Sequence, residues 1–327
     1  MTKNIMTNCI LCPRMCHVDR NSGAGFCGCL ASIRAARAGL HFYEEPFLSG
    51  LCGSGAVFFS GCNLRCVYCQ NSQISGGDYR SAGAAFGMET TTDRLSEIFL
   101  ELQAQGAHNI NLVTGTPYIP FIAEALSNVG ADNSLKIPVI WNSGGYERVE
   151  SLKMLEGLVD IWLPDFKTLS PELGQRYMNA PDYPEAAKKA LEWMVNVSGP
   201  AKFEAYAREC RPEAAYTLED IEESGIMVHG VCVRHLVIPG QTEDSKRVLE
   251  YLHGTFGGDI WVSLMSQYTP MRTDFPQEEL NRTVTAEEYE EVVNFAIDLG
   301  IENCMIQAEG VANESFIPAF DGTGVLG

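Results

Sequence analysis

Short apolar runs alternate with amphipathic segments along most of this chain. Runs with the length of a buried strand occur at 56–59, 110–113, 138–141, 158–163, 231–238, 260–265 and 304–306. Apolar residues at three- and four-residue spacing, typical of helices with one buried face, occur between them at 95–102, 122–126, 149–155, 182–194, 244–252 and 287–299. Strand and helix repeated about six times predict parallel βαβ units, which both open doubly wound sheets and barrels contain.

Two segments do not follow this alternation. Ahead of the first strand, Ile33, Ala36 and Leu40 recur at helical spacing until a Glu-Glu-Pro sequence breaks the pattern, so a helix is predicted there. The connection 167–230 is longer than one crossover helix requires, and it includes an acidic run at 219–223. A lid, a docking surface for a protein substrate and a solvated edge all stay open for this connection.

Polar residues and glycines stand directly after the predicted strands. They are Thr114, Gly115 and Thr116 after the second strand, Asn142 and Ser143 after the third, and Asp165 and Lys167 after the fourth. The carboxyl ends of parallel strands lie on one side of a sheet or barrel, and active sites of such folds form there. The sequence therefore predicts the chemistry at these strand ends.

Three cysteines with the spacing C-x3-C-x2-C follow the first predicted strand on one loop: Cys62, Cys66 and Cys69. Thiolates are soft ligands that suit iron–sulfur clusters or zinc. Closed structural sites of either kind usually take four protein ligands, so three thiols leave one metal position open for a substrate or cofactor. The alternative is half of a zinc knuckle, or a set of unligated loop cysteines.

A second group of cysteines lies near the amino terminus, where C-x2-C-P-R-x-C is followed by a glycine-rich turn. A complete four-ligand set is formed by Cys9, Cys12, Cys16 and Cys27. Cys27 is preferred to Cys29 because it is the first cysteine after the glycine-rich turn. The spacing fits either a [4Fe-4S] cluster or zinc, and reduced thiols in a flexible arm are the alternative. Roles for His17 and Cys52 stay open.

The composition is that of an ordinary globular protein, with 46% hydrophobic and 20% charged residues among 327. The formal charge of −19 argues against a nucleic-acid partner, because phosphate-binding surfaces are basic. Residues 1–40 are an exception, since Asp19 is their one acidic residue beside Lys3, Arg14, Arg20, Arg34 and Arg37. These cations either form a patch for an acidic electron carrier or offset the charge of the thiolates.

The cysteine content bears on the cellular environment. Twelve cysteines in a chain whose first residues lack the apolar stretch of a signal peptide favour metal binding over disulfides. No run reaches the roughly 20 apolar residues that span a bilayer, so no membrane partner is expected. We therefore expect a cytoplasmic protein that works at low oxygen.

The C-x3-C-x2-C loop, with the aromatic Tyr68 just before its last cysteine, resembles the radical S-adenosylmethionine (SAM) superfamily. This resemblance implies an α/β fold: the partial (β/α)6 TIM-like barrel of these enzymes over 51–327, including a C-terminal tail, preceded by a small Cys-rich metal-binding extension over 1–50. It implies a [4Fe-4S] cluster on Cys62, Cys66 and Cys69 whose fourth iron chelates SAM. Reductive cleavage of SAM then gives a 5′-deoxyadenosyl radical that takes hydrogen from a substrate.

Three strand-end motifs are similar to those of the activating enzyme of pyruvate formate-lyase and its uncharacterised homologues. They are Asn142-Ser143-Gly144, Asp165-Phe166-Lys167 and Val233-Arg234-His235-Leu236-Val237-Ile238-Pro239-Gly240. The resemblance implies that Tyr68 presents its backbone to the adenine of SAM. It implies that Asp165 and Lys167 hold the ribose or carboxylate, and that Arg234 also contacts SAM. A surface ion pair of Asp165 with Lys167, and a counter-ion role for Arg234 in the core, are the alternatives.

Two features depart from that activating enzyme. Thr114-Gly115-Thr116-Pro117 stands where a G-G-E motif orients the SAM amino group, although carbonyl and hydroxyl oxygens accept the same hydrogen bonds. The Cys-rich head also precedes the main motif. The expected function is a radical SAM oxidoreductase that removes hydrogen from a glycine of a glycyl-radical enzyme, with flavodoxin or ferredoxin as the acidic electron donor. The rivals are modification of another peptide or small molecule, and a non-catalytic metal- or redox-binding partner protein.

Overall fold

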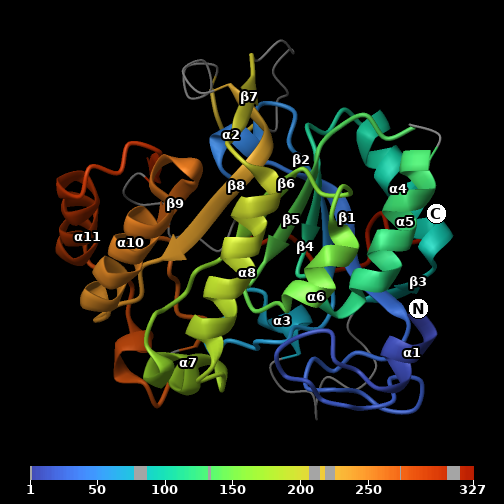
Figure 1. The fold of residues 1–327 in the computed structure, drawn as a ribbon, viewed down its shortest axis with the longest axis horizontal. Helices are drawn as coiled ribbons and strands as arrows, with labels where there is room; N and C mark the ends of the chain where they lie inside the picture. Colours follow the sequence, from blue (N-terminus) through green and yellow to red (C-terminus); the bar gives the residue numbers. More distant parts are fainter. Residues whose placement is uncertain are drawn as a thin grey trace.

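The structure is a computed structural model that describes residues 2–76, 87–131, 134–205, 214–217, 225–272, 274–307 and 317–327. Cys210 and the acidic run at 219–223 lie outside these described residues. Figure 1 shows a curved central sheet with helices along its outer face.

Seven parallel strands form the sheet, in the order β2, β4, β5, β6, β8, β9 and β10. Their bounds are Ser54–Phe59, Ile110–Val113, Val139–Ser143, Ile161–Pro164, Ile226–Leu236, Trp261–Met265 and Cys304–Ile306. Among the described strands β10 and β3 form the two edges of the sheet, so the barrel is open. The prediction of an α/β fold with a partial (β/α) barrel is confirmed.

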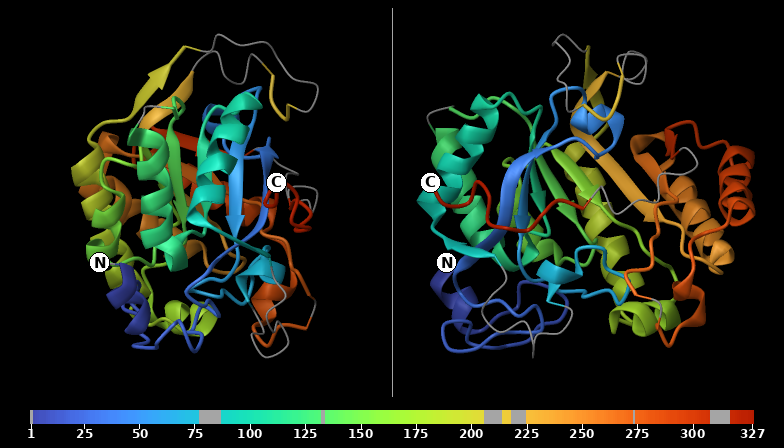
Figure 2. Two further views of the ribbon diagram at one scale, coloured as in Figure 1. Left: turned by 90° about the vertical axis from the view of Figure 1, so that its right-hand side faces the viewer. Right: turned by 180° about the vertical axis from the view of Figure 1, so that it is seen from behind.

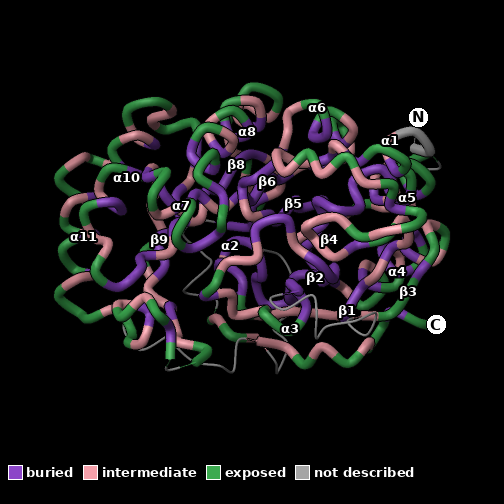
Figure 3. Tube along the Cα trace, turned by 90° about the horizontal axis from the view of Figure 1, so that it is seen from below, coloured by how far each residue is buried: buried purple, intermediate pink, exposed green. Residues whose placement is uncertain are grey.

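The helices that cover the sheet follow the predicted periodicity. They are α4 (Thr92–Ala104), α5 (Ile119–Ala131), α6 (Val149–Leu152) with a 3-10 turn at Lys153–Leu155, α7 (Pro171–Met178), α8 (Tyr183–Ser198), α10 (Thr242–Phe256) and α11 (Ala286–Asp298). Thr91 caps α4, since its hydroxyl accepts a hydrogen bond from the Arg94 amide at 3.1 Å. Figure 3 shows buried strands at the centre and exposed outer helix faces. No helix of the described chain has the length and apolar character that crossing a membrane requires.

The helix predicted around Ile33, Ala36 and Leu40 is wrong. These residues form strand β1 (Ile33–His41), which pairs antiparallel with β2 on one edge and with β3 (Met88–Thr90) on the other. A register shift between Ala35 and Arg37 places Ala35 and Ala36 both in the interior, so the two-residue alternation of a strand is lost. Although β1 precedes residue 50 it is part of the sheet; the domain boundary at that residue stays a prediction.

The two ends of the barrel are covered by different segments (Figures 1 and 2). The head, which we define as residues 8–32, lies with α3 (Ser72–Ser75) and α7 at the carboxyl ends of the parallel strands; α1 (Thr2–Thr7) adjoins it. α2 (Pro46–Ser49) and β7 (Lys202–Glu204) lie at the opposite end. The head therefore covers the side where the sequence places the chemistry.

Apolar side chains fill the barrel between the α2 end and the carboxyl ends of the strands. One buried cluster inside the barrel joins α2 to the strands through residues that include Phe47, Ile140, Leu163 and Cys232. The larger core lies between the sheet and its helices. Since the interior is packed from the α2 end, the carboxyl end with its cysteine loop is the place for a site.

Candidate metal and cofactor site

The cysteine loop, residues 60–71, leaves the end of β2 and leads into α3. Cys62, Cys66 and Cys69 are half-buried free thiols. The Gly61 amide donates to the Ile74 carbonyl at 2.7 Å, and the Cys69 amide donates to the Cys66 carbonyl at 3.1 Å. These hydrogen bonds fold the loop back on itself and hold its three thiols beside the strand end.

The electrostatics of the loop suit a metal centre. Burial raises the pKa of Cys66 to about 12 and that of Cys69 to about 11, and neighbouring thiols add to the effect. The ammonium of Lys167 acts in the opposite direction on the pKa of all three thiols. A metal held by these thiols would supply the further positive charge that lets them bind as thiolates.

The donor set fits an iron–sulfur cluster, in which each thiolate binds a different iron. Within the described ranges, no three Cys, His, Asp or Glu side chains are grouped closely enough to hold one metal ion. The three mutually interacting thiols and the cation beside them are therefore the observation on which the fit depends.

Three residues next to the candidate cysteines have left-handed backbone although they are not glycine. In the described chain, five residues other than glycine have a positive φ between 41° and 60°: Met15, His17, Arg65, Thr114 and Asn179. The first two flank Cys16. Arg65 precedes Cys66, and Thr114 directly follows β4. Such conformations cost about 1–3 kcal/mol each and occur mostly at functional sites.

Asp165 and Lys167 follow β6 and face the cysteine loop. The Lys167 ammonium lies 2.6 Å from a carboxylate oxygen of Asp165. Although burial alone would lower it, Asp165 and the Cys66 thiol hold the pKa of Lys167 well above its usual range. The hydroxyl of Tyr183 accepts the Lys167 amide at 2.9 Å and donates to the Asp165 carbonyl at 3.0 Å. The pair is thus a fixed, half-buried feature of the strand end.

The ends of β4 and β5 meet at a carboxyl group that the sequence analysis missed. The hydroxyls of Thr116 and Ser143 donate to Glu147 at 2.7 Å and 3.1 Å, and the Thr114 amide donates to the Asn142 carbonyl at 2.8 Å. Burial raises the pKa of Glu147 to about 7. Its position in the glycine-rich turn after β5 was the signal that could have identified it.

Gly115 and Asn142 lie buried among these groups. A Cβ atom at Gly115 would approach Trp141 to 2.9 Å and Ile122 to 2.7 Å, so the turn after β4 packs too tightly for a side chain. The structure therefore brings the predicted strand-end residues together, while their contacts with a cofactor stay predictions.

Arg234 has partners that were not predicted. Its guanidinium binds Glu44 and Glu45, with the Nε atom donating to Glu45 at 2.8 Å. Asn111 donates to Glu44 from β4 at 2.7 Å. The counter-ion alternative is thus what the structure displays, whereas a contact between Arg234 and SAM stays a prediction. His235 points to the helix side, where its Nε2 atom lies 2.9 Å from the Ser245 hydroxyl.

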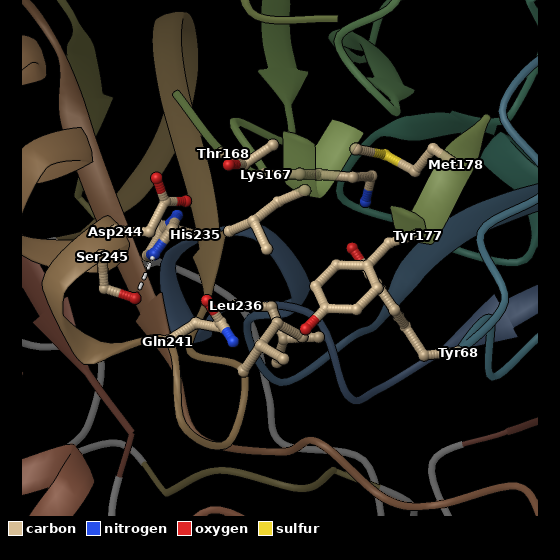
Figure 4. Close-up of a pocket in the computed structure, with 12 residues that line it drawn as sticks. Tyr68, Lys167, Thr168, Tyr177, Met178, His235, Leu236, Gln241, Asp244 and Ser245 are labelled. Atoms are coloured by element: carbon tan, nitrogen blue, oxygen red, sulfur yellow. Dashed lines mark hydrogen bonds between the residues drawn. The ribbon is translucent and has the colours of Figure 1, made fainter. Parts of the chain in front are cut away.

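A narrow pocket lies beside the cysteine loop, between α7 and the start of α10 (Figure 4). Tyr68 and Lys167 line it together with Tyr177 and Gln241. The ring of Tyr68 is buried, with its edge toward Tyr177 at 5.8 Å between centroids. Two residues predicted to contact the same cofactor therefore border one pocket.

The predicted ligands of the head influence one another electrostatically. Burial raises the pKa of Cys12 to about 12, and the charges of Cys27, Cys16 and Cys9 add to this effect. Their binding of a metal stays a prediction. Cys27 also interacts with Cys62 of the cysteine loop. Cys29 lies beside Cys27, since its thiol shares a hydrogen bond with the Cys27 thiol and contacts the carbonyls of Cys27 and Ser60. The preference for Cys27 over Cys29 as the fourth ligand therefore stays a prediction. The Nδ1 atom of His17 is 2.9 Å from Asn8, and Cys52 precedes β2 at the opposite end of the barrel.

The basic residues of the head do not form one surface patch. Arg20 is fully buried and donates to the carbonyls of Pro117 at 2.5 Å and Leu30 at 2.6 Å. Arg14 donates to three carbonyls outside the head. Arg20 also interacts with Cys27 and neighbouring thiols, as the charge-offset alternative requires. A patch that includes Arg20 is therefore wrong.

Comparisons with known proteins give one family match and several similar proteins. The family model described as the radical SAM superfamily matches residues 56–207. An uncharacterised protein of Methanocaldococcus jannaschii is 28% identical over 90% of this chain and 76% of its own length. A domain of the pyruvate-formate lyase-activating enzyme of Bacteroides vulgatus aligns over 59% of this chain and 92% of its own, with 13% identity and a TM-score of 0.38. SuiB of Streptococcus suis bound to S-adenosylmethionine aligns over 76% and 48%, with 11% identity and a TM-score of 0.44.

Proposed function

The chain belongs to the radical SAM superfamily, and from this premise we propose that it activates a glycyl-radical enzyme by removing the α-hydrogen of one glycine. Membership implies a [4Fe-4S] cluster and SAM, which together supply a 5′-deoxyadenosyl radical when both are bound. One observation carries the proposal: three interacting thiols lie beside the Asp165–Lys167 pair at the carboxyl ends of the strands.

The residues have distinct roles in this proposal. Cys62, Cys66 and Cys69 hold three irons, and Lys167 offsets part of the thiolate charge. The Asp165–Lys167 pair binds the ribose or carboxylate of SAM, and the backbone at Tyr68 faces its adenine. The remaining cofactor contacts are proposed for Thr114, Gly115, Thr116, Asn142, Ser143 and Arg234. Glu147 fixes the hydroxyls of Thr116 and Ser143 and so sets the shape of this part of the site.

The strand-end motifs resemble those of activating enzymes and follow the same order, and this resemblance is the reason for proposing glycine as the hydrogen donor. A flavodoxin or ferredoxin would supply the electron. The alternative hypothesis is that the substrate is another peptide or a small molecule. Experiment can distinguish this alternative from glycyl-radical activation.

The test starts from protein purified without oxygen. We expect a reduced-cluster electron paramagnetic resonance signal that shifts on addition of SAM, and release of 5′-deoxyadenosine. Cys62→Ala, Cys66→Ala and Cys69→Ala should each abolish both, whereas Cys304→Ala, which alters a thiol in β10, should not. A glycine-centred radical on a glycyl-radical enzyme of the same genome supports activation. SAM cleavage with no radical on any such enzyme would overturn it.

We further propose that Cys9, Cys12, Cys16 and Cys27 hold a second metal centre, either a [4Fe-4S] cluster or zinc. The mutual charge interactions of these four thiols support this. About eight irons per chain would indicate two clusters, and about four irons with one zinc would indicate a zinc head. Four irons without zinc in freshly purified protein would contradict a head metal.

A further inference from the structure

We propose that Arg14 is a positioning residue through which the head metal centre sets the geometry of the cysteine loop. The inference rests on the proposed function, because it concerns how that function is regulated. Arg14 stands between Cys12 and Cys16 in the sequence, yet its side chain leaves the head. It has no carboxylate partner among the salt bridges of the described chain, and its donors go to main-chain carbonyls.

The first contact of Arg14 is with the cysteine loop itself. Its Nε atom donates to the carbonyl of Asn63, which directly follows Cys62, at 2.9 Å. The Asn63 side chain in turn donates to the Tyr146 carbonyl at 2.6 Å. Asn63 is therefore fixed through both its carbonyl and its side chain. Two residues later, Arg65 with its left-handed backbone turns the chain toward Cys66.

The other contacts of Arg14 are with the last turn of α7. Its Nη2 atom donates to the Met178 carbonyl at 2.7 Å, and Nη1 donates to the Asn179 carbonyl. The same turn binds the cysteine loop, since the Tyr177 carbonyl accepts the Val67 amide at 2.9 Å. Arg14 thus closes a ring of contacts among the head, the cysteine loop and α7.

The orientation of Arg14 depends on the head. Its guanidinium lies over the ring of Phe26 at 3.9 Å, and the Phe26 amide donates to the Cys16 thiol at 3.4 Å. Cys12 and Cys16 thus stand on either side of Arg14 in the sequence, and Cys27 directly follows Phe26. Closing these thiols on a metal fixes Arg14 and Phe26 relative to each other, which reduces the entropy lost when the guanidinium binds the loop. Lysine lacks the planar fork that reaches three carbonyls.

Arg148 provides a matched control. It also joins the head to the barrel, by donating to the Ile10 carbonyl at 2.8 Å, and its ion pair is with Glu150; in the described part of the chain its hydrogen bonds do not reach the cysteine loop. Arg148→Gln should weaken the attachment of the head to the barrel about as much as Arg14→Gln does. It should leave the geometry of the cysteine loop unchanged.

The experiment compares Arg14→Gln, Arg14→Lys, Arg148→Gln and Cys12→Ser with the full-length wild type. We expect Arg14→Gln to keep its iron but to weaken SAM binding about tenfold or more, read from the SAM-dependent resonance shift. Arg14→Lys should recover part of this loss, and Arg148→Gln should match the wild type. In metal-free protein, Arg14→Gln should speed hydrogen exchange of the amides at 62–69, whereas Arg148→Gln should not.

The double variant tests the coupling itself. Cys12→Ser should weaken SAM binding as Arg14→Gln does. The double variant should bind SAM no more weakly than either single variant, because both substitutions break the same link between the head metal and the cysteine loop. Additive losses, or unchanged SAM binding in Arg14→Gln, would overturn the inference while the radical chemistry stands. A wild type without any SAM-sensitive signal would instead overturn the proposed function. If Arg14→Gln does not fold, Arg14→Lys decides by the same criteria.

Discussion

Glu45 and Glu147 are both buried glutamates, yet their surroundings move their pKa values in opposite directions. Although Glu45 is buried, the guanidinium of Arg234 holds its pKa below the usual value. Glu147 has no guanidinium beside it; burial raises its pKa to about 7, and the hydroxyls of Thr116 and Ser143 offset only part of this. One glutamate is a charged partner in the core, and the other has a pKa close to neutral at the edge of the site.

Replacing Glu147 with Gln should remove a pH dependence from the stability of the metal-free protein. The folded chain keeps this proton up to a pH of about 7, whereas the unfolded chain releases it near the ordinary value of 4.5. The unfolded state thus binds fewer protons between these values, so the free energy of unfolding falls as pH rises through this window, by at most about 3 kcal/mol. Urea unfolding across the window measures it. Equal slopes for wild type and variant would show that Glu147 is ionised when folded.

Arg234→Met should destabilise the metal-free protein by about 3–5 kcal/mol, because Glu44 and Glu45 would stay buried without a counter-charge. The triple variant E44Q/E45Q/R234M should recover much of this loss, since no buried charge is left uncompensated. Urea unfolding measures both. An Arg234→Met protein of unchanged stability but weaker SAM binding would assign Arg234 to the cofactor.

At the scale of elements, periodicity predicted most helices and parallel strands but not β1. Ile33, Ala36 and Leu40 have helical spacing because the register shift beside Ala35 interrupts the alternation of a strand. Pairing on both edges, with β2 and β3, is what makes the segment a strand. β3 lies about 50 residues further along the chain, and both strands pair with β1 through backbone atoms. The pattern of side chains within 33–41 therefore cannot reveal this pairing.

Glycine in the turn after β5 allows two strand ends to approach each other. Gly145 has a φ of +75°, and a Cβ atom there would overlap the carbonyl oxygen of Asp165. Gly157 has a φ of +73° with no atom within 4 Å of the same position. The two glycines share a positive φ, which costs glycine little but disfavours other residues, and they differ in their surroundings.

Gly145→Ala should therefore destabilise the protein more than Gly157→Ala. Both variants incur about 1–2 kcal/mol for a left-handed alanine. Gly145→Ala adds about 1–3 kcal/mol of overpacking and displaces the backbone that carries Asp165. Thermal unfolding gives the difference, and SAM binding should weaken only in Gly145→Ala. Similar losses in both variants would show that the strand ends can separate at little cost.

At the scale of the whole molecule, the site divides into a part that the sequence predicts and a part that it does not. The cysteine spacing and the polar strand ends are local patterns, so Cys62, Cys66, Cys69, Asp165 and Lys167 were identifiable without a structure. Thr116, which binds Glu147, the carboxylates that bind Arg234, and the carbonyls bound by Arg14 lie at distances along the chain that no motif spans. Only the fold specifies which backbone oxygens and buried carboxylates those side chains reach.

Truncation tests how the whole sheet depends on the segment before residue 50. A fragment of residues 51–327 lacks β1, so β2 becomes an unpaired edge that favours aggregation. It also lacks Glu44 and Glu45, which leaves the guanidinium of Arg234 buried without partners. We expect this fragment to be insoluble or to lose cooperative unfolding.

A fragment of residues 31–327 is the control, because it lacks the head but keeps β1 and both carboxylates. It should retain native far-ultraviolet circular dichroism and unfold cooperatively at a lower temperature than the full chain, since the contacts of Arg20 with the barrel are lost. Soluble yield and thermal unfolding of the two fragments compare them directly. A 51–327 fragment as stable as 31–327 would show that the barrel folds without β1, and that the domain boundary does lie near residue 50.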